Sequence, residues 1–254
     1  TIASMIGAQV CGEACVDVEW LLTDSRSLCF PESTLFFAIR TDRGDGHRYV
    51  RDLYERGVRA FVVNSVQEGL PGAVQLLVQD TLTALQRLAE RHRESYDIPV
   101  IGITGSNGKT VIKEWLYQML SPDMAVTRSP RSYNSQIGVP LSVWGLNSNS
   151  QIGIFEAGIS RPGEMAALQR IIQPTIGVFT GLGPAHQENF QSMEQKRQEK
   201  MLLFKDCPVV FEAGDEADAL ERDRNLCARV CRYLGMSEEV IQERLQRLEP
   251  VAMR

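Results

Sequence analysis

The segment GITGSNGKT, residues 102–110, contains three glycines, and the last of them is followed directly by a lysine and a threonine. Gly105 and Gly108 allow a sharp turn in which successive backbone N–H groups point at phosphate oxygens. Lys109 would then reach the outer phosphates of a nucleotide, and the Thr110 hydroxyl would bind Mg²⁺. The loop is shorter than the usual G-x-x-x-x-G-K-[ST] pattern, which would need a glycine at Ile103. We predict a phosphate-binding loop, with a plain connecting turn as the alternative.

Three further side chains are candidates for chemistry. Glu156 ends an apolar stretch, where a carboxylate is costly unless it is paired or bound to a metal; a capping or salt-bridged glutamate is the alternative. His186 follows a glycine-rich turn, and because Mg²⁺ prefers oxygen ligands, its residue type alone is equally typical of an ordinary loop histidine. Lys200 ends MEQKRQEK, residues 193–200, a composition typical of a solvated helix face.

Two polar motifs are candidates for substrate contacts. In DSR, residues 24–26, the Ser25 hydroxyl and the Arg26 guanidinium suit phosphate or uracil, and a turn with a surface arginine is the alternative. Asn134, in YNSQIGVP, is by composition an ordinary turn residue.

The first part of the chain must position the DSR motif. Alternating β-branched and aromatic residues predict three strands, and helical spacing predicts two helices. The strands are STLFFAIR (33–40), VRAFVVN (58–64) and AVQLLVQD (73–80), and the helices are GHRYVRDLYERG (46–57) and TLTALQRLAERHRESY (81–96). SYDIP, residues 95–99, breaks the pattern, so we expect two domains, 1–96 and 97–254.

From Pro99 onward the chain repeats a strand, loop and helix. Nearly continuous apolar strands alternating with helices predict an α/β domain whose parallel sheet is covered on both faces. In such sheets ligands bind at the carboxyl ends of the strands, where the loop 105–110, Glu156 and His186 all fall. The strand expected in CPVVF (207–211) leads almost directly into a helix. Two explanations stay open: a naturally short version of the fold, or an internal segment near 215–225 that is missing.

Bulk composition limits the classes of protein. The chain of 254 residues is 43% hydrophobic and 23% charged with a net charge of −5, which is typical of a globular protein and argues against nucleic-acid binding. No apolar stretch approaches a bilayer span and no signal pattern opens the chain, so we expect a cytoplasmic protein without membrane insertion. Six cysteines without a C-x-x-C predict buried, reduced thiols.

TGSNGKT resembles the shortened phosphate loop of the Mur ligase family, ATP-dependent enzymes that join an amino compound to a carboxylate in cell-wall precursor synthesis. RSYNSQIGVPLSVW, GIFEAGISRPGEM, GLGPAHQENF and EKMLLFKD follow in the family's order and at about its spacing. The N-terminal LLTDSRSLCFPESTLFFAIR resembles the UDP-sugar-binding domain of the MurF type, which adds D-alanyl-D-alanine to UDP-N-acetylmuramoyl-tripeptide. Several segments resemble most the form fused to an alanine racemase.

The resemblance implies roles for particular residues. It implies an N-terminal UDP-sugar-binding domain and a central ATP-binding domain, without the family's third domain. The ATP-binding residues that it implies are Gly105, Ser106, Asn107, Gly108, Lys109, Thr110 and Arg254. The implied Mg²⁺ ligands are Thr110, Glu156, His186 and a carbamylated Lys200, formed with CO₂. The implied substrate contacts are Ser25, Arg26 and Asn134, and the implied catalytic groups are Lys109, His186 and Lys200. The family's adenine-contacting asparagine has no clear match, since Asn225 is near it but out of register.

The implied reaction is ATP-dependent formation of an amide bond through an acyl phosphate. The resemblance also implies further ligase and racemase domains on the C-terminal side, so we expect that this chain alone does not ligate. Two alternatives stay open: another ligase with the same loop, such as a folylpolyglutamate synthetase, and a non-catalytic nucleotide-binding module.

Overall fold

The computed structural model describes residues 1–41, 44–183 and 189–251. The chain divides into two compact units, Thr1–Arg91 and His92–Arg254. Each unit has its own five-stranded sheet. The division falls within α3 (Thr81–Arg93), a few residues before the predicted linker at 95–99.

The first unit is built on a mixed sheet in the order β1-β7-β6-β3-β2. Only β1 runs antiparallel to its neighbour, and the other pairs are parallel. β3 and β6 are buried along their whole length, so the apolar runs predicted as strands form the core. Its elements are α1 (Ile2–Ile6), β1 (Gln9–Cys11), β2 (Trp20–Leu22), β3 (Thr34–Phe37), β4 (Arg40–Thr41), β5 (Gly44–Asp45), α2 (Val50–Glu55), β6 (Ala60–Val63), β7 (Val74–Leu77) and most of α3.

The second unit has the all-parallel sheet that the sequence predicts, in the order β12-β11-β8-β10-β9. Its strands are β8 (Val100–Thr104), β9 (Val126–Arg128), β10 (Ile152–Glu156), β11 (Ile176–Phe179) and β12 (Val209–Glu212). Its helices are α4 (Lys109–Leu120), α5 (Gly138–Val143), α6 (Met165–Ile172), α7 (Met193–Met201), the 3-10 turn η5 (Leu202–Phe204), α8 (Ala219–Tyr233) and α9 (Glu238–Gln246). The alternative of a missing segment near 215–225 stays a prediction.

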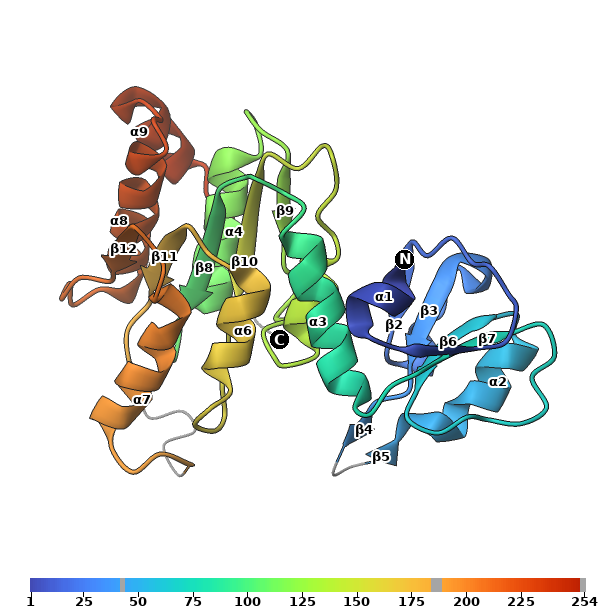
Figure 1. Ribbon diagram of the computed structural model, residues 1–254. Coiled ribbons are helices and arrows are strands. Elements are labelled where there is room, and N and C mark those ends of the chain that lie inside the picture. Colours follow the sequence, from blue (N-terminus) through green and yellow to red (C-terminus); the bar gives the residue numbers. More distant parts are fainter. Residues whose placement is uncertain (42–43, 184–188, 252–254) are drawn as a thin grey trace. The chain divides into compact units, whose positions relative to one another are not determined.

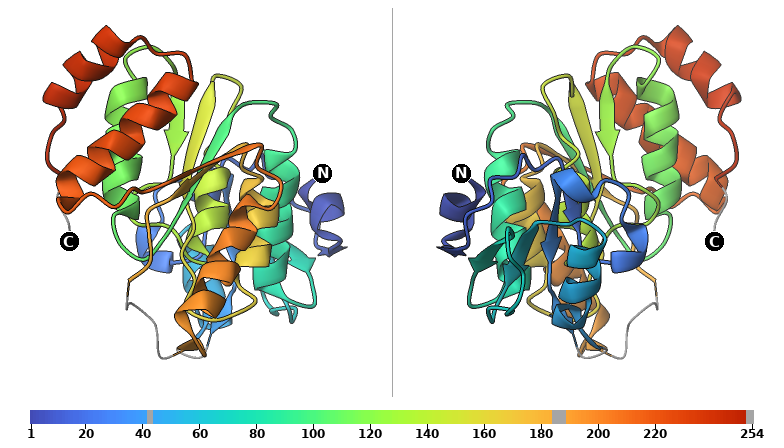
Figure 2. Two further views of the ribbon diagram at one scale, coloured as in Figure 1. Left: turned by 90° about the vertical axis from the view of Figure 1, so that its left-hand side faces the viewer. Right: turned by 90° about the vertical axis from the view of Figure 1, so that its right-hand side faces the viewer.

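Helices cover both faces of this parallel sheet (Figure 1). On one side α4 packs on the strands, and α8 and α9 pack on α4; α5, α6 and η5 lie on the other side (Figure 2). Isoleucines of β8 and β10 interlock with Ile112, Leu116 and the buried thiols of Cys227 and Cys231. This apolar layer holds α4 rigidly behind the loop that precedes it.

Glycines on the other face let η5 approach the sheet closely. Gly102 of β8 and Gly177 of β11 are direct partners across the parallel pair. A Cβ atom at Gly177 would lie 2.6 Å from the Phe204 ring of η5, whereas one at Gly102 would lie 2.8 Å from Pro174 and at an ordinary contact distance of 3.5 Å from Leu203. Because η5 continues α7 without a break, this close packing also holds Lys200 against the sheet.

The cysteines depart in part from expectation. All six are free, and Cys227 and Cys231 are buried as predicted. Cys15 and Cys29 are exposed, so the prediction of buried thiols is wrong for them. Both lie in irregular segments of the first unit outside its core. Within the described residues, no helix has both the length and the apolar character needed to cross a bilayer.

Candidate functional site

The predicted phosphate loop lies between β8 and α4 in a conformation that requires glycine. Gly105 has a φ of 150° and Gly108 a φ of 80°. A Cβ atom at Gly105 would lie 2.1 Å from the Thr180 hydroxyl oxygen. Gly108 is the N-cap of α4, so the first N–H groups of that helix face the loop.

Hydrogen bonds connect the loop to residues at and beyond the carboxyl end of β11, the strand beside β8. The N–H of Ser106 donates to the carbonyl of Gly181 at 2.9 Å, and its hydroxyl donates to the carbonyl of Gly183 at 3.2 Å. The Thr180 hydroxyl donates to the carbonyl of Asn107. These hydrogen bonds join the carboxyl ends of β8 and β11. Residues more than 70 positions further along the chain therefore fix the position of the loop.

Three lysine ammonium groups lie around the loop. Lys109 Nζ donates to the carbonyl oxygen of Gly105 at 3.0 Å, and Lys200 Nζ donates to the same oxygen at 3.0 Å. Lys196 Nζ donates to the carbonyl of Gly183 at 2.6 Å. Lys196 is only 1% exposed and Lys200 only 3%, so the solvated helix face suggested by composition is wrong for both. The reason is the packing of η5, which presses this part of α7 inward.

Burial and mutual repulsion change the acidity of these lysines. Burial lowers the pKa of Lys109, and the Glu156 carboxylate partly offsets that effect. Burial lowers the pKa of Lys200 to about 8, with smaller contributions from the Lys109 and Lys196 charges. The site thus concentrates positive charge, which favours an anion, and it makes the neutral amine of Lys200 more accessible than that of an ordinary lysine.

A carboxylate lies at the end of the neighbouring strand. Glu156, the last residue of β10, is fully buried. Its Oε2 accepts hydrogen bonds from the Thr110 hydroxyl at 3.1 Å and from Asn134 Nδ2 at 3.4 Å. Three residues singled out from the sequence therefore meet at one carboxylate. Gly158 holds the Asn134 backbone here, because its N–H donates to the Asn134 carbonyl at 2.8 Å.

The residues present fit a divalent metal that a nucleotide helps to hold. Glu156 Oε1 is buried and has no hydrogen-bond donor in the part of the chain that is described. Thr110 supplies a hydroxyl beside the same carboxylate. Mg²⁺ is commonly held by one or two carboxylates together with substrate phosphates. Within residues 1–41, 44–183 and 189–251 no group of three or more His, Cys, Asp or Glu side chains is placed to hold a metal ion.

Two predicted site residues, His186 and Arg254, lie outside the described residues. In the first unit, Ser25 and Arg26 belong to a 3-10 turn, Ser25–Ser27, that follows β2. The Arg26 guanidinium pairs with the Asp24 carboxylate at 2.6 and 2.9 Å, and its side chain is 87% exposed. An exposed ion pair of this kind contributes little to stability.

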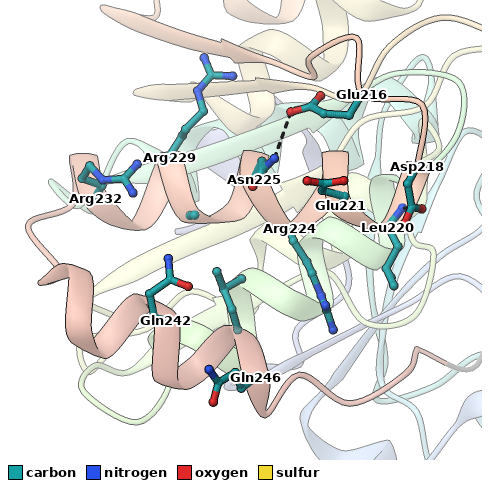
Figure 3. A pocket seen from close by; sticks show the side chains of 12 residues that line it. Glu216, Asp218, Leu220, Glu221, Arg224, Asn225, Arg229, Arg232, Gln242 and Gln246 are labelled. Atoms are coloured by element: carbon teal, nitrogen blue, oxygen red, sulfur yellow. Dashed lines mark hydrogen bonds between the residues drawn. The ribbon is translucent and has the colours of Figure 1, made fainter.

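Asn225 lies apart from the loop contacts. It lines a cavity of about 650 Å³ between α8 and α9, and its side chain donates to Glu216 Oε1 at 3.1 Å (Figure 3). Asp223, on another side of α8, is the residue that approaches the loop: a Cβ atom at Gly108 would lie 3.2 Å from its carboxylate. Burial raises the pKa of Asp223.

Lys113 is not among the site residues predicted from the sequence. This lysine is fully buried, and its ammonium contacts the Glu156 carboxylate at 3.2 Å. It lies one helical turn after Lys109, between the core residues Ile112 and Leu116. A lysine on the apolar face of an amphipathic helix was the available signal.

A phosphate-type loop at the carboxyl edge of a parallel sheet, with a lysine, a hydroxyl and a buried carboxylate around it, defines a nucleotide-binding α/β protein. The model of the Mur ligase middle domain matches residues 103–248. A UDP-N-acetylmuramoyl-tripeptide–D-alanyl-D-alanine ligase of Bacillus subtilis is 34% identical over 203 residues, 78% of this chain and 44% of that protein. The Treponema pallidum protein of the same name is 32% identical over 262 residues, 96% of this chain and 56% of that protein. The chain belongs to the Mur ligase family.

Solved structures agree in fold. MurF from Acinetobacter baumannii superposes with a TM-score of 0.89 at 21% identity, covering 98% of this chain and 68% of that one. MurF from Thermotoga maritima in complex with ADP superposes with a TM-score of 0.68 at 26% identity, covering 82% of this chain and 48% of that one. The chain spans about half the length of the two curated relatives described above.

Proposed function

We propose that this chain is the substrate-binding and ATP-binding part of a MurF-type ligase, which adds D-alanyl-D-alanine to UDP-N-acetylmuramoyl-tripeptide in peptidoglycan precursor synthesis. The observation that carries the proposal is the convergence of Lys109, Thr110, Glu156 and Lys200 on one loop at the edge of the parallel sheet. The named relatives favour this substrate pair over that of a folylpolyglutamate synthetase.

The loop's part in this reaction is to bind and orient the phosphates of ATP. Backbone N–H groups of residues 107–110 and the positive end of α4 face the phosphates, and Lys109 neutralises the charge that develops on the transferred group. To do so, Lys109 exchanges its contacts with the loop carbonyls for contacts with the nucleotide. The tripeptide carboxylate accepts the γ-phosphoryl group, and the amine of D-alanyl-D-alanine then displaces phosphate from the acyl phosphate.

Thr110 and Glu156 would hold Mg²⁺, which supplies Lewis-acid neutralisation of the phosphate oxygens when it is bound. Lys200 would act as a carbamate, formed when its neutral amine attacks CO₂ and loses a proton. Its burial and its pKa of about 8 favour that reaction. His186 belongs to the same proposed set of ligands, and Asn134 orients the Glu156 carboxylate and the substrate.

The first unit would bind the UDP-sugar through Ser25 and Arg26. Further domains on the C-terminal side, for the incoming amine and for a fused racemase activity, complete the proposed protein, with Arg254 near the ATP. Because its substrates are ATP and a nucleotide-linked precursor, we place the protein in the cytoplasm, acting on small molecules and on neither nucleic acid nor membrane.

Phosphate release tests this function. In a longer protein that includes the further ligase domain, ATP should be hydrolysed only when both UDP-N-acetylmuramoyl-tripeptide and D-alanyl-D-alanine are present. Release that depends on folate and glutamate instead would identify the alternative ligase. ATP binding without release under either condition would identify a non-catalytic module. The 254-residue chain alone should bind ATP and UDP-sugar without forming product.

A further inference from the structure

Lys113 is a fully buried cation beside the carboxylate proposed to hold the metal. Its Nζ lies 3.2 Å from Glu156 Oε1, and both side chains are fully buried. A lone buried charge of either sign would be strongly unfavourable, so each of these groups compensates the other. The proposed chemistry makes no use of this lysine.

The Lys113 ammonium donates its hydrogen bonds to groups other than Glu156. An ammonium has three N–H donors. The Lys113 ammonium donates to the Ser129 carbonyl at 2.9 Å and to the Arg131 carbonyl, and it pairs with Glu114 Oε1 at 2.9 Å. Glu156 Oε1 consequently receives charge compensation from Lys113 but no hydrogen bond. Its lone pairs stay free for another ligand.

We propose that Lys113 is a resident counter-cation that compensates the charge of the Glu156 carboxylate and leaves its Oε1 open while no metal is bound. The inference rests on the proposed function, because it assumes that a divalent metal enters with the nucleotide. When the metal leaves with the product, the buried carboxylate is still compensated, so the empty site is stable. The same positive charge repels the bound metal, so it weakens metal affinity and lets the metal exchange during turnover.

Lys113 also fixes the segment that completes the site. Its bonds to the Ser129 and Arg131 carbonyls hold the chain leading to Ser132 and Asn134. The Ser132 hydroxyl lies 3.3 Å from that of Thr110, and Ser129 Oγ accepts from the Glu156 N–H at 3.2 Å. Lys113 is therefore a positioning residue that acts through Glu156 and this segment.

The test measures metal binding rather than activity. Mn²⁺ is titrated into the ADP-loaded 254-residue chain and its affinity is followed by electron paramagnetic resonance, with melting temperatures recorded with and without metal. In Lys113→Met, Mn²⁺ should bind at least fivefold more tightly, because the repulsion between the metal and the Lys113 ammonium is removed. The metal-free variant should melt lower than wild type, and Mn²⁺ should raise its melting temperature by more than it raises that of wild type.

Arg128→Met is the matched control. Arg128 pairs with Glu114 at 3.0 Å. Within the described residues its guanidinium forms no ion pair with Glu156, so its loss should leave Mn²⁺ affinity unchanged. Unchanged or weaker Mn²⁺ binding in Lys113→Met would overturn the inference and leave a structural lysine. A wild-type chain that binds no Mn²⁺ with ADP would overturn the proposed function and the inference together.

A measurement on the wild-type chain covers the case in which Lys113→Met does not fold. With ¹⁵N-labelled lysine, bound Mn²⁺ should broaden the Lys113 ammonium resonance beyond detection and leave that of the exposed Lys205 sharp. Mg²⁺, which is diamagnetic, should leave the Lys113 resonance visible. A Lys113 resonance that stays sharp with saturating Mn²⁺ and ADP would refute the inference.

Discussion

Lys109 and Lys200 donate hydrogen bonds to the same atom, the carbonyl oxygen of Gly105, each at 3.0 Å. Two ammonium groups on one acceptor repel each other, and the repulsion contributes to the lowered pKa of Lys200. An anion bound in the loop would draw Lys109 away from this carbonyl and relieve the repulsion. The pair thus links occupation of the loop to the charge state of the neighbouring lysine.

Lys109→Ala should abolish nucleotide binding by the loop while leaving the fold intact. The side chain contributes charge, and within the described part of the chain its hydrogen bonds go to loop carbonyls, so its loss removes little packing. We expect ATP turnover in the longer ligase to fall by about a hundredfold or more, as for other single donors that stabilise developing charge. Circular dichroism should be unchanged. Wild-type rates of phosphate release in this variant would contradict the assignment of Lys109.

Carbamate formation at Lys200 should rise with pH through about 8. The neutral amine reacts with CO₂, and with a pKa of about 8 it makes up about a tenth of the molecules at pH 7. Carbon-13 NMR with labelled bicarbonate should show a carbamate resonance that Lys200→Ala removes and Lys205→Ala retains. Full ligase activity of Lys200→Ala at low bicarbonate would contradict the role; partial recovery with short carboxylates would support it.

The same lysine should make stability depend on pH. Its pKa is lowered from 10.5 in the unfolded chain to about 8 in the folded one. Between these values the unfolded state binds more protons, so the free energy of unfolding should rise as pH rises from about 8 toward 10.5. Lys200→Met should flatten this rise in urea denaturation at several pH values. An equal slope in wild type and variant would show that other groups cause it.

Gly108→Ala should lower stability and ADP binding by the loop more than substitution of a surface glycine does. Its φ of 80° disfavours any side chain, and the added Cβ would lie 3.2 Å from the Asp223 carboxylate. Positive φ at a non-glycine residue costs about 1–2 kcal/mol. Gly72→Ala is a suitable control, because its φ of 71° gives similar strain in open surroundings. Equal losses of stability in both, with ADP binding retained in Gly108→Ala, would exclude a special role for the loop glycine.

Thiol modification should divide the cysteines into two groups. Cys15 and Cys29 are exposed and should react with a thiol reagent in the native chain. Cys227 and Cys231 are buried, and burial raises the pKa of Cys231 to about 12 and that of Cys227 well above its usual value. Both should react only after denaturation, which mass spectrometry of labelled peptides would detect. Rapid native labelling of Cys227 would contradict the packing of α8 on α4.

The sequence by itself determined the features that depend on neighbouring residues. Apolar runs and helical spacing determined the parallel sheet of the second unit, and α4 begins at Lys109 as expected from the glycine that precedes it. The loop could be recognised because its function needs glycines, a lysine and a hydroxyl within a few consecutive positions. Glu156 at the end of an apolar strand was equally visible.

Only the tertiary structure decided which distant groups meet. Lys200 lies 95 residues from Gly105, and its helix has the composition of a solvated face, yet the glycines of β8 and β11 let η5 press it against the loop. The Ser129 and Arg131 carbonyls that accept hydrogen bonds from Lys113 lie 16 and 18 residues further along the chain. Periodicity reports which face of an element is apolar, whereas the partners of a buried charge come from other elements. Their contact depends on how closely the backbones approach, which no local pattern specifies.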